Sequence, residues 1–384
     1  MMIYFDNAAT TGKKPLSVIN AVNNALKNFS VNPGRGGYRE SSLCAERIYN
    51  VRREVADFFG AKNETAVIFT HNCTTALNYV IKGVLNRGDH VICSSLEHNA
   101  VMRPLYEMKN KGVEVDVANV IFDDNEATVR SFSNLIKPNT KLIICTHASN
   151  VTGHIMPIKE IGEICRRKGI KFLVDAAQTA GVVPIDMKNM NIDYLCVAAH
   201  KGLYAPESIG LLIALSPIEN TIIEGGTGTN SFEYSQPSFM PERFESGTVS
   251  VPLIFGLGAG LGFIKSKGIN NLYSHEIGIA KSAYDGLISL GGVTVYSSRP
   301  EENYTVPTLS FNLRGIESLY VAELLSEYKT SVRAGLHCAP MAHSSIGTSD
   351  MGTVRISFAF FNTKEEVFRF LEQVKRIKQK SGKK

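Results

Sequence analysis

Residues 171–178 read Lys-Phe-Leu-Val-Asp-Ala-Ala-Gln, a short apolar run that ends in an acidic and an amide side chain. A run without polar alternation is typical of a strand that is buried on both faces of a sheet. Between residues 65 and 215 the same layout recurs, because short β-branched runs alternate with stretches of helical periodicity. Strands separated by helices predict an α/β fold with a mainly parallel sheet covered on both faces.

Seven runs of this kind are expected to form the sheet: residues 66–70, 90–94, 113–117, 141–146, 171–174, 194–198 and 209–214. Ligands of such sheets bind beyond the carboxyl ends of the strands. Polar groups follow three of the runs, at residues 147–153, 175–178 and 200–201. The sequence therefore predicts a ligand site at this edge of the sheet.

At 384 residues the chain is longer than one hydrophobic core usually serves, so two packed units are expected. A second α/β unit is predicted beyond residue 262, with strands at residues 293–296, 309–312, 332–333 and 353–356. The glycine-rich stretch 256–262 has Leu261 where a G-x-G-x-x-G nucleotide loop needs its third glycine. We interpret this stretch as small residues that let two helices pack closely.

Composition and charge exclude several classes of protein. The net charge is +5, and much of it lies at residues 375–384 rather than on a face shared with aromatics, so no nucleic-acid binding is expected. There is no signal-peptide pattern and no apolar stretch of the roughly 18 residues that a membrane helix needs. None of the seven cysteines forms a C-x-x-C pair, which predicts a cytoplasmic protein with buried thiols.

Four short motifs carry chemically useful side chains. Three are weak signals taken alone: Asp175-Ala-Ala-Gln178, His200-Lys201 and Glu97-His98-Asn99-Ala100, which is equally explained as a helix cap. The fourth is Arg333-Ala-Gly-Leu-His337-Cys338. The pattern R-x-G-x-H-C is expected by chance in well under about one in a thousand chains, so this motif is specific.

Taken in order, these motifs resemble those of the class V aminotransferases of fold-type I, and within them the group II cysteine desulfurases and selenocysteine lyases. The resemblance runs from Asp6-Asn-Ala-Ala9 to Arg355-Ile-Ser-Phe-Ala-Phe-Phe-Asn362. It implies a fold-type I pyridoxal 5′-phosphate (PLP)-dependent transferase and a homodimer with active sites at the subunit interface. The large PLP-binding domain, with the seven-stranded sheet, is expected at residues 20–262, and a smaller α/β domain at residues 1–19 and 263–384.

The resemblance assigns roles around the cofactor ring. Lys201 matches the catalytic lysine that forms the Schiff base with PLP and then moves protons. Asp175 matches the carboxylate that keeps the pyridine nitrogen protonated, which makes the ring an electron sink. Gln178 matches the residue that hydrogen-bonds the ring hydroxyl, and His98 matches the catalytic imidazole that stacks on the ring.

The cofactor phosphate and the substrate carboxylate need different partners. A phosphate is expected at a helix N-terminus with hydroxyls nearby, and the matching residues are Cys73, Thr74, His200 and, toward the partner subunit, Gly247 and Thr248. Arg355 matches the guanidinium that binds the substrate α-carboxylate. Asn150 matches a residue beside both cofactor and substrate, and Arg333 matches a further substrate ligand.

Cys338 matches the nucleophile of this family. The matching thiolate takes the sulfur of PLP-bound cysteine and leaves alanine and an enzyme persulfide; Arg333 and His337 are expected to supply the positive charge that favours a thiolate. Cys338 is alternatively a buried structural cysteine like the other six. No metal site is predicted, because His337, Cys338 and His343 are only three ligands at irregular spacing.

The sequence departs from the family pattern in three places. Ala198 stands where a serine hydroxyl usually binds the phosphate, residues 202–208 contain one residue more than the commoner pattern, and Gly34 stands where a histidine often precedes the arginine matching Arg35. These departures leave the expected cofactor unchanged. They indicate a divergent branch in which the substrate or the sulfur acceptor can differ.

The first interpretation is therefore a PLP-dependent cysteine desulfurase that converts L-cysteine to L-alanine and holds the sulfur on Cys338 for an acceptor protein. A selenocysteine lyase, or another class V aminotransferase or lyase acting on a small amino acid, is the alternative. A non-enzymatic scaffold is disfavoured, because it would not need Lys201, Asp175 and Arg355 together.

Overall fold

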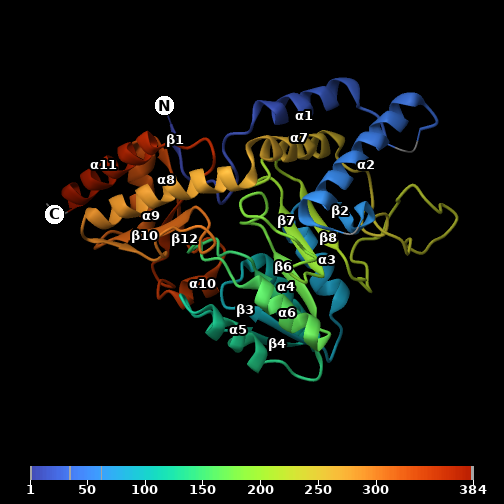
Figure 1. Cartoon of the computed structure of the whole chain (residues 1–384), viewed down its shortest axis with the longest axis horizontal. Coiled ribbons are helices and arrows are strands. Elements are labelled where there is room, and N and C mark those ends of the chain that lie inside the picture. Colours follow the sequence, from blue (N-terminus) through green and yellow to red (C-terminus); the bar gives the residue numbers. More distant parts are fainter. Residues whose placement is uncertain (1, 34–35, 62, 382–384) are drawn as a thin grey trace.

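The computed structural model describes residues 2–33, 36–61 and 63–381; Gly34 and Arg35 lie outside them. A seven-stranded sheet with the order β2-β8-β7-β6-β5-β3-β4 forms its centre (Figure 1). The strands are Val67–Thr70 (β2), His90–Ser94 (β3), Glu114–Ala118 (β4), Thr140–Thr146 (β5), Lys171–Asp175 (β6), Tyr194–Ala198 (β7) and Gly210–Ala214 (β8). β8 is antiparallel to both neighbours and the other pairs are parallel. The mainly parallel sheet is confirmed. Each of its seven predicted strands begins and ends within one residue of the observed strand.

Helices cover both faces of this sheet. On one face lie α3 (Cys73–Val84) and α4 (Asn99–Asn110). On the other lie α2 (Arg39–Phe59), α5 (Asn125–Asn134), α6 (Ile158–Lys168) and α7 (Val251–Lys267), with α1 (Leu16–Asn28) packed against α7. The sheet is therefore the middle layer of three, which is why its strands are apolar at nearly every position.

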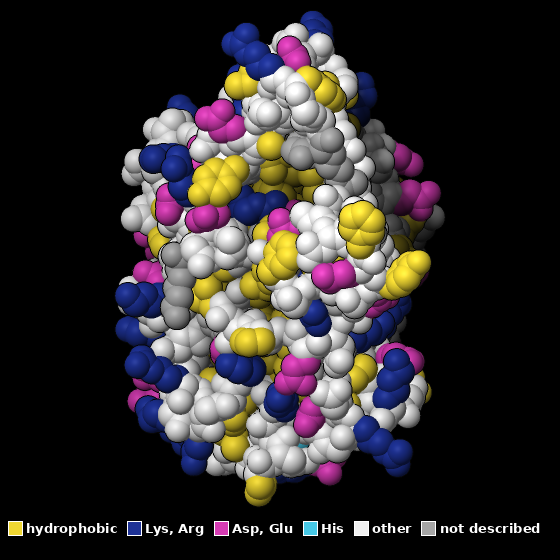
Figure 2. All heavy atoms as spheres, turned by 90° about the vertical axis from the view of Figure 1, so that its right-hand side faces the viewer, with side chains coloured by type: hydrophobic (Ala, Val, Ile, Leu, Met, Phe, Trp, Pro, Cys, Tyr) yellow, Lys and Arg dark blue, Asp and Glu magenta, His cyan; other side chains and the backbone are white. Residues whose placement is uncertain are grey.

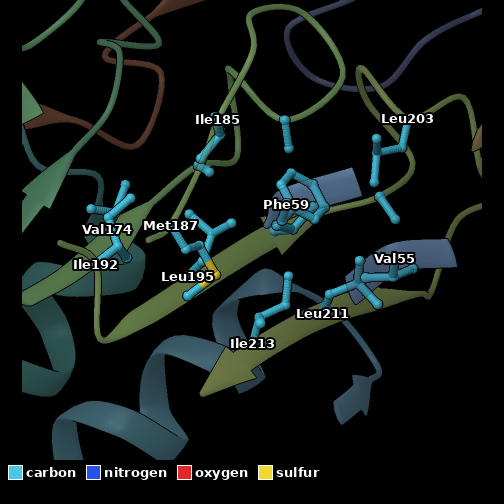
Figure 3. Close-up of a cluster of buried hydrophobic side chains, with 14 of the residues drawn as sticks. Val55, Phe59, Val174, Ile185, Met187, Ile192, Leu195, Leu203, Leu211 and Ile213 are labelled. Atoms are coloured by element: carbon cyan, nitrogen blue, oxygen red, sulfur yellow. The ribbon is translucent and has the colours of Figure 1, made fainter. Parts of the chain in front are cut away.

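Alternate residues of one strand enter different cores. In β5, Leu142 and Ile144 pack with α3 and α4, whereas Ile143 and Cys145 pack with the helices of the opposite face. Figure 3 shows part of that second core, where Phe59 of α2 lies above Leu195 of β7. Burial on both sides fixes the register of these strands, because a shift by one residue would exchange the two faces.

The glycine-rich stretch belongs to α7 and allows close packing, as predicted. A Cβ at Gly258 would lie 2.7 Å from Val51 of α2, and one at Gly256 would lie 3.0 Å from Val22 of α1. A Cβ at Gly260 would lie 2.2 Å from the backbone oxygen of Leu203, two residues after Lys201. The glycines thus also let α7 lie directly against the Lys201 loop.

A second unit is built on an antiparallel sheet with the order β12-β13-β10-β9. Its strands are Val293–Val295 (β9), Thr308–Leu313 (β10), Arg333–Gly335 (β12) and Thr353–Ser357 (β13). Its helices are α8 (Ile269–Ser289), α9 (Ser318–Glu327), α10 (Pro340–Ser345) and α11 (Lys364–Ser381). The second α/β unit predicted beyond residue 262 is present.

The N-terminal residues pack into the core of this second unit. Ile3 and Phe5 are buried with Phe311 and Phe370, and β1 (Ile3–Tyr4) pairs in parallel with β11 (Thr330–Ser331). The predicted domain boundaries fall inside α1 and α7, so the division into residues 20–262 and 1–19 with 263–384 stays a prediction.

All seven cysteines are free; six are buried and Cys338 is exposed. Within residues 2–33, 36–61 and 63–381, no helix combines the length and the apolar character needed to cross a membrane. The thiols therefore contribute to packing, with Cys338 as the exception.

The contact of Gly210 with α3 supports a test of the fold. A Cβ at Gly210 would lie 2.4 Å from the backbone carbon of Asn72, so Gly210→Ala should displace the N-terminus of α3 and lower the free energy of unfolding by about 1–3 kcal/mol. Chemical denaturation measures this difference. In the matched control, Gly262→Ala, the new Cβ meets nothing within 4 Å, and the higher helix propensity of alanine should leave stability equal or raised. Equal destabilisation in both variants would contradict this packing.

Candidate active site

The predicted polar groups meet at one edge of the large sheet. β5, β6 and β7 are parallel neighbours, so their carboxyl ends bring together residues 147–150, 175–178 and 200–201. A turn follows β7, in which the N–H of Lys201 donates to the carbonyl of Ala198. Glu97–Ala100 follows β3, which is the parallel neighbour of β5, so the sheet topology alone collects three of the four motifs.

The Lys201 amine lies in an unusual electrostatic environment. It forms no hydrogen bond or ion pair within the described ranges. Burial, and then the guanidinium of Arg355, lowers its pKa to about 8, while the negative charge of Asp175 acts in the opposite direction. A lysine with a lowered pKa has a larger neutral fraction near pH 7, and the neutral amine is the nucleophilic form.

Asp175 is the last residue of β6 and is 4 % exposed. Its Oδ1 accepts hydrogen bonds from the N–H of Ala177 at 2.9 Å and from the Cys73 thiol at 3.5 Å. Its Oδ2 has no hydrogen-bond partner in the described part of the chain. Burial, with the charge of Asp175, raises the pKa of Cys73 well above its usual range, so this thiol stays protonated.

His98 is the N-cap of α4, and its Nδ1 accepts the N–H of Ala100 at 3.0 Å. This bond leaves Nε2 as the protonated nitrogen of the neutral ring. Burial lowers the pKa of His98, and the cations of Lys201, Arg333 and Arg355 lower it further, against the opposing effect of Asp175. The helix-cap interpretation is thus confirmed for His98, and its role against the cofactor ring stays a prediction.

Glu97, which precedes His98, is a residue whose importance the sequence did not reveal. It is fully buried, and its Oε1 accepts hydrogen bonds from the Ser94 hydroxyl and from the N–H of Thr146 at the end of β5. Burial raises the pKa of Glu97 to about 7. Its carboxyl group fixes the loop that carries His98 to the neighbouring strand.

Gln178 and His200 connect the sheet edge to the N-terminal segment. The Gln178 amide donates to the carbonyl of Ala8 at 3.1 Å, and His200 Nδ1 lies 3.0 Å from the Thr10 hydroxyl. Burial and the charge of Lys201 lower the pKa of His200 to about 4, so its ring is neutral near pH 7. Both side chains are therefore held by the N-terminal segment that begins with the sequence motif Asp6–Ala9.

Arg355 lies on β13 with a side chain that is only 1 % exposed. Its Nη2 donates to Asp6 Oδ1 at 2.7 Å, and its Nη1 donates to the backbone carbonyl of Asn150 at 3.1 Å. Its Nε is buried and has no hydrogen-bond partner within the described residues. The guanidinium therefore keeps an unused donor beside Lys201, which suits a carboxylate ligand.

Cys338 lies in the turn between β12 and α10, where the sulfur is 3.5 Å from Nη2 of Arg333. The expected guanidinium partner is confirmed, but the expected charge on His337 is wrong. Burial, and then the charge of Arg355, lowers the pKa of His337 to about 2, so the ring is neutral. The exposed thiol also excludes the interpretation of Cys338 as a buried structural cysteine.

Thr74, His98 and Cys338 line one cavity of about 330 Å³ between α3 and α4. Thr74 is exposed at the N-terminal turn of α3, which is capped by Asn72. Asn150 lies beside the turn that carries Cys338, since its amide donates to the carbonyl of His337 at 2.8 Å. The cavity therefore joins the thiol to the helix N-terminus expected to hold the phosphate.

Gly247 and Thr248 are not in this cavity. They are exposed and line a separate hollow of about 470 Å³ together with Arg52 and Glu245. Arg52 and Glu245 form a buried bidentate ion pair, with N···O distances of 2.7 and 2.9 Å, and Glu245 Oε1 also accepts the N–H of Phe69 at 2.7 Å. This ion pair anchors the segment that carries Thr248. No local sequence motif predicted the ion pair.

The model of the aminotransferase class-V family matches residues 3–370. The chain belongs to the class V aminotransferase family. The resemblance seen in the motifs is thereby confirmed, and the match covers both units.

Within this class V family, the chain is similar to proteins named for one activity. It is 30 % identical to a "probable cysteine desulfurase" of Methanothermobacter thermautotrophicus, over 95 % of this chain and 92 % of the relative. The apo structure of a cysteine desulfurase from Thermococcus onnurineus is 31 % identical, with a TM-score of 0.90, and the alignment covers 98 % of this chain and 95 % of that one. The cysteine desulfurase CsdA of Escherichia coli is 28 % identical, with a TM-score of 0.86 over 98 % and 94 %.

The pKa of Lys201 supports a test in the cofactor-free protein. Because only the neutral amine reacts with acetic anhydride, labelling of Lys201 should rise with pH through a midpoint at about 8. Mass spectrometry of the Lys201 peptide measures the labelled fraction. Arg355→Met removes a cation that lowers this pKa, so the midpoint should move to higher pH. A midpoint near the ordinary value of 10.5 in the unmodified protein would show that the amine is not in this environment.

Proposed function

We propose that this class V family member is a PLP-dependent cysteine desulfurase that converts L-cysteine to L-alanine and transfers the sulfur to Cys338. The observation that carries the proposal is the position of the exposed Cys338 thiol. It lies beside the Arg333 guanidinium and in one cavity with His98. The similarity to proteins named cysteine desulfurase supports the same activity.

The residues fit PLP on three points of their own chemistry. The Lys201 amine has no competing partner within the described residues, and its lowered pKa favours the form that reacts with an aldehyde. Asp175 has an unused oxygen for the pyridine nitrogen. The N-terminal turn of α3, with Thr74, supplies N–H groups and a hydroxyl for a phosphate. When PLP is bound, it supplies an electron sink for the substrate α-carbon.

Each side chain then has a defined task. Arg355 binds the α-carboxylate through the guanidinium edge that Asp6 and Asn150 leave free. With cofactor and substrate bound, the neutral amine of Lys201 would move the proton at the substrate α-carbon. The neutral ring of His98, whose Nε2 carries the proton, would move a second proton when the cofactor is bound.

Cys338 performs the sulfur step. Its thiolate attacks the substrate sulfur, so an S–S bond forms while the C–S bond breaks, and the bonding electrons go to the carbon side. Protonation of that carbon gives alanine, and one sulfur atom stays on the enzyme as a persulfide. The Arg333 guanidinium, with its Nη2 3.5 Å from the sulfur, places a positive charge beside this nucleophile.

A homodimer with shared active sites belongs to this proposal. Loop 215–250 lies at the right of Figure 1, and apolar side chains gather on the face that Figure 2 turns toward the viewer. Phe232 and Tyr234 of this loop are fully exposed. A second copy covering this face would bring Gly247 and Thr248 toward its phosphate. The reduced thiols are consistent with a cytoplasmic location and with delivery of the sulfur to an acceptor protein.

Cys338→Ser tests the proposed activity. Binding of cysteine should persist, because Lys201 and Arg355 are unchanged, but alanine formation should fall by at least about a hundredfold, since a hydroxyl is a far poorer nucleophile toward sulfur. Alanine and sulfide are measured with cysteine, and alanine and selenide with selenocysteine. Loss with cysteine alone supports a desulfurase, because the weaker C–Se bond needs less assistance. Unchanged turnover of both substrates would contradict the proposal and favour another class V aminotransferase or lyase.

A further inference from the structure

Cys338 is presented by a tight turn whose backbone is unusual for its residues. The N–H of Ala339 donates to the carbonyl of Leu336 at 2.8 Å, and the two residues between them, His337 and Cys338, have φ angles of 50° and 57°. Turns with two left-handed central residues normally contain glycine or asparagine. Because neither is present, contacts outside the turn must hold this conformation.

Two of these contacts reach the backbone of the turn. The carbonyl of His337 accepts the Asn150 amide at 2.8 Å, and the carbonyl of Cys338 accepts the N–H of Asn99 at 2.7 Å. They tie the turn to the end of β5 and to the start of α4.

The third contact is a buried chain of side chains that the proposed mechanism does not use. His337 Nδ1 lies 3.2 Å from His343 Nε2, and His343 Nδ1 lies 2.7 Å from the Thr348 hydroxyl. At the other end, His337 Nε2 lies 3.4 Å from the carbonyl of Arg333. The two rings are nearly parallel, at 15°, and all three side chains are at most 2 % exposed.

The direction of every hydrogen bond in this chain follows from its ends. The Arg333 carbonyl can only accept, so His337 carries its proton on Nε2 and accepts at Nδ1. His343 must therefore donate from Nε2 and accept at Nδ1, which requires the Thr348 hydroxyl to donate to this nitrogen at 2.7 Å rather than to the His343 carbonyl at 3.5 Å. Both rings are neutral, in agreement with burial that lowers the pKa of His343 to about 4. A proton added to His337 would make two N–H groups face one another. A proton added to His343 would leave a buried cation.

We propose that His343 and Thr348 are positioning residues that act through His337 to hold the turn in which Cys338 faces the active site. The chain ends on the backbone of Arg333, the residue whose guanidinium contacts the sulfur. Loss of the Thr348 hydroxyl leaves the buried His343 Nδ1 without the donor that this arrangement requires. This inference rests on the proposed function of Cys338 as the sulfur acceptor.

The test compares Thr348→Val with Thr348→Ser in the holoenzyme. Valine keeps the shape and removes the hydroxyl, whereas serine keeps the hydroxyl. Two reactions are followed: alanine formation from L-cysteine, which needs Cys338, and exchange of the α-proton of L-alanine with deuterium, which needs Lys201 but not the thiol. Thr330→Val is the matched control, because it removes another buried hydroxyl, hydrogen-bonded to Gln373 in the second unit.

We expect Thr348→Val to lower kcat with cysteine by about tenfold or more, because a small misplacement of a nucleophile has effects of this size. The KM for cysteine and the exchange rate should stay unchanged, and Thr348→Ser and Thr330→Val should behave like the unmodified enzyme. A parallel fall of both reactions would show a merely structural role, and no fall in either would show that the chain does not position Cys338; both outcomes overturn the inference.

Alkylation of Cys338 by iodoacetamide, read by mass spectrometry, separates this inference from the proposed function. If the unmodified enzyme forms no alanine from cysteine, the proposed function fails, and alkylation still tests the positioning. Thr348→Val should react at least about threefold more slowly, since the turn no longer holds the sulfur at its exposed position beside the Arg333 guanidinium. Equal alkylation rates in the unmodified enzyme, Thr348→Val and Thr348→Ser would overturn it.

Discussion

The guanidinium of Arg355 is buried where three separate parts of the chain meet. A buried cation is tolerated only when it is paired and hydrogen-bonded. Here Asp6 of the N-terminal segment and the carbonyl of Asn150 after β5 supply the partners, while the arginine itself lies on β13 of the second sheet. The site is therefore complete only when both units and the N-terminus are packed together. Burial lowers the pKa of Lys201, and the same cation lowers it further, so one ion pair both orders the site and contributes to its electrostatics.

The strands of the large sheet could be predicted because burial on both faces leaves a local signature, a run of apolar residues without alternation. Their order could not, since pairing depends on residues far apart in the chain. Nothing local indicates that β8 is antiparallel between β2 and β7, or that Ile3 and Phe5 are buried against Phe311. Those features arise from long-range packing, which a single sequence does not display.

The same distinction holds for the site. Lys201 and Asp175 were singled out because each follows a predicted strand at the ligand edge, and their roles come from the resemblance to the class V family. The thiol was singled out through a specific motif. The charge expected on His337 was wrong, because the sequence did not show that the ring would be buried and paired with His343. The sequence did not reveal the structural roles of Glu97, Glu245 and Thr348 for a related reason. Glu97 and Glu245 have hydrogen-bond partners that are distant in the sequence, and the contact of Thr348 with His343 forms only in the folded chain.

The proposed reaction leaves a sulfur atom taken from cysteine on Cys338. The most direct measurement is the mass of the Cys338 peptide after the holoenzyme has reacted with one equivalent of L-cysteine without reductant. We expect a gain of one sulfur atom on this peptide, matched by one equivalent of alanine, and removal of the gain by a reducing thiol. Alanine formation with an unchanged Cys338 peptide, or sulfur on one of the buried cysteines instead, would contradict it.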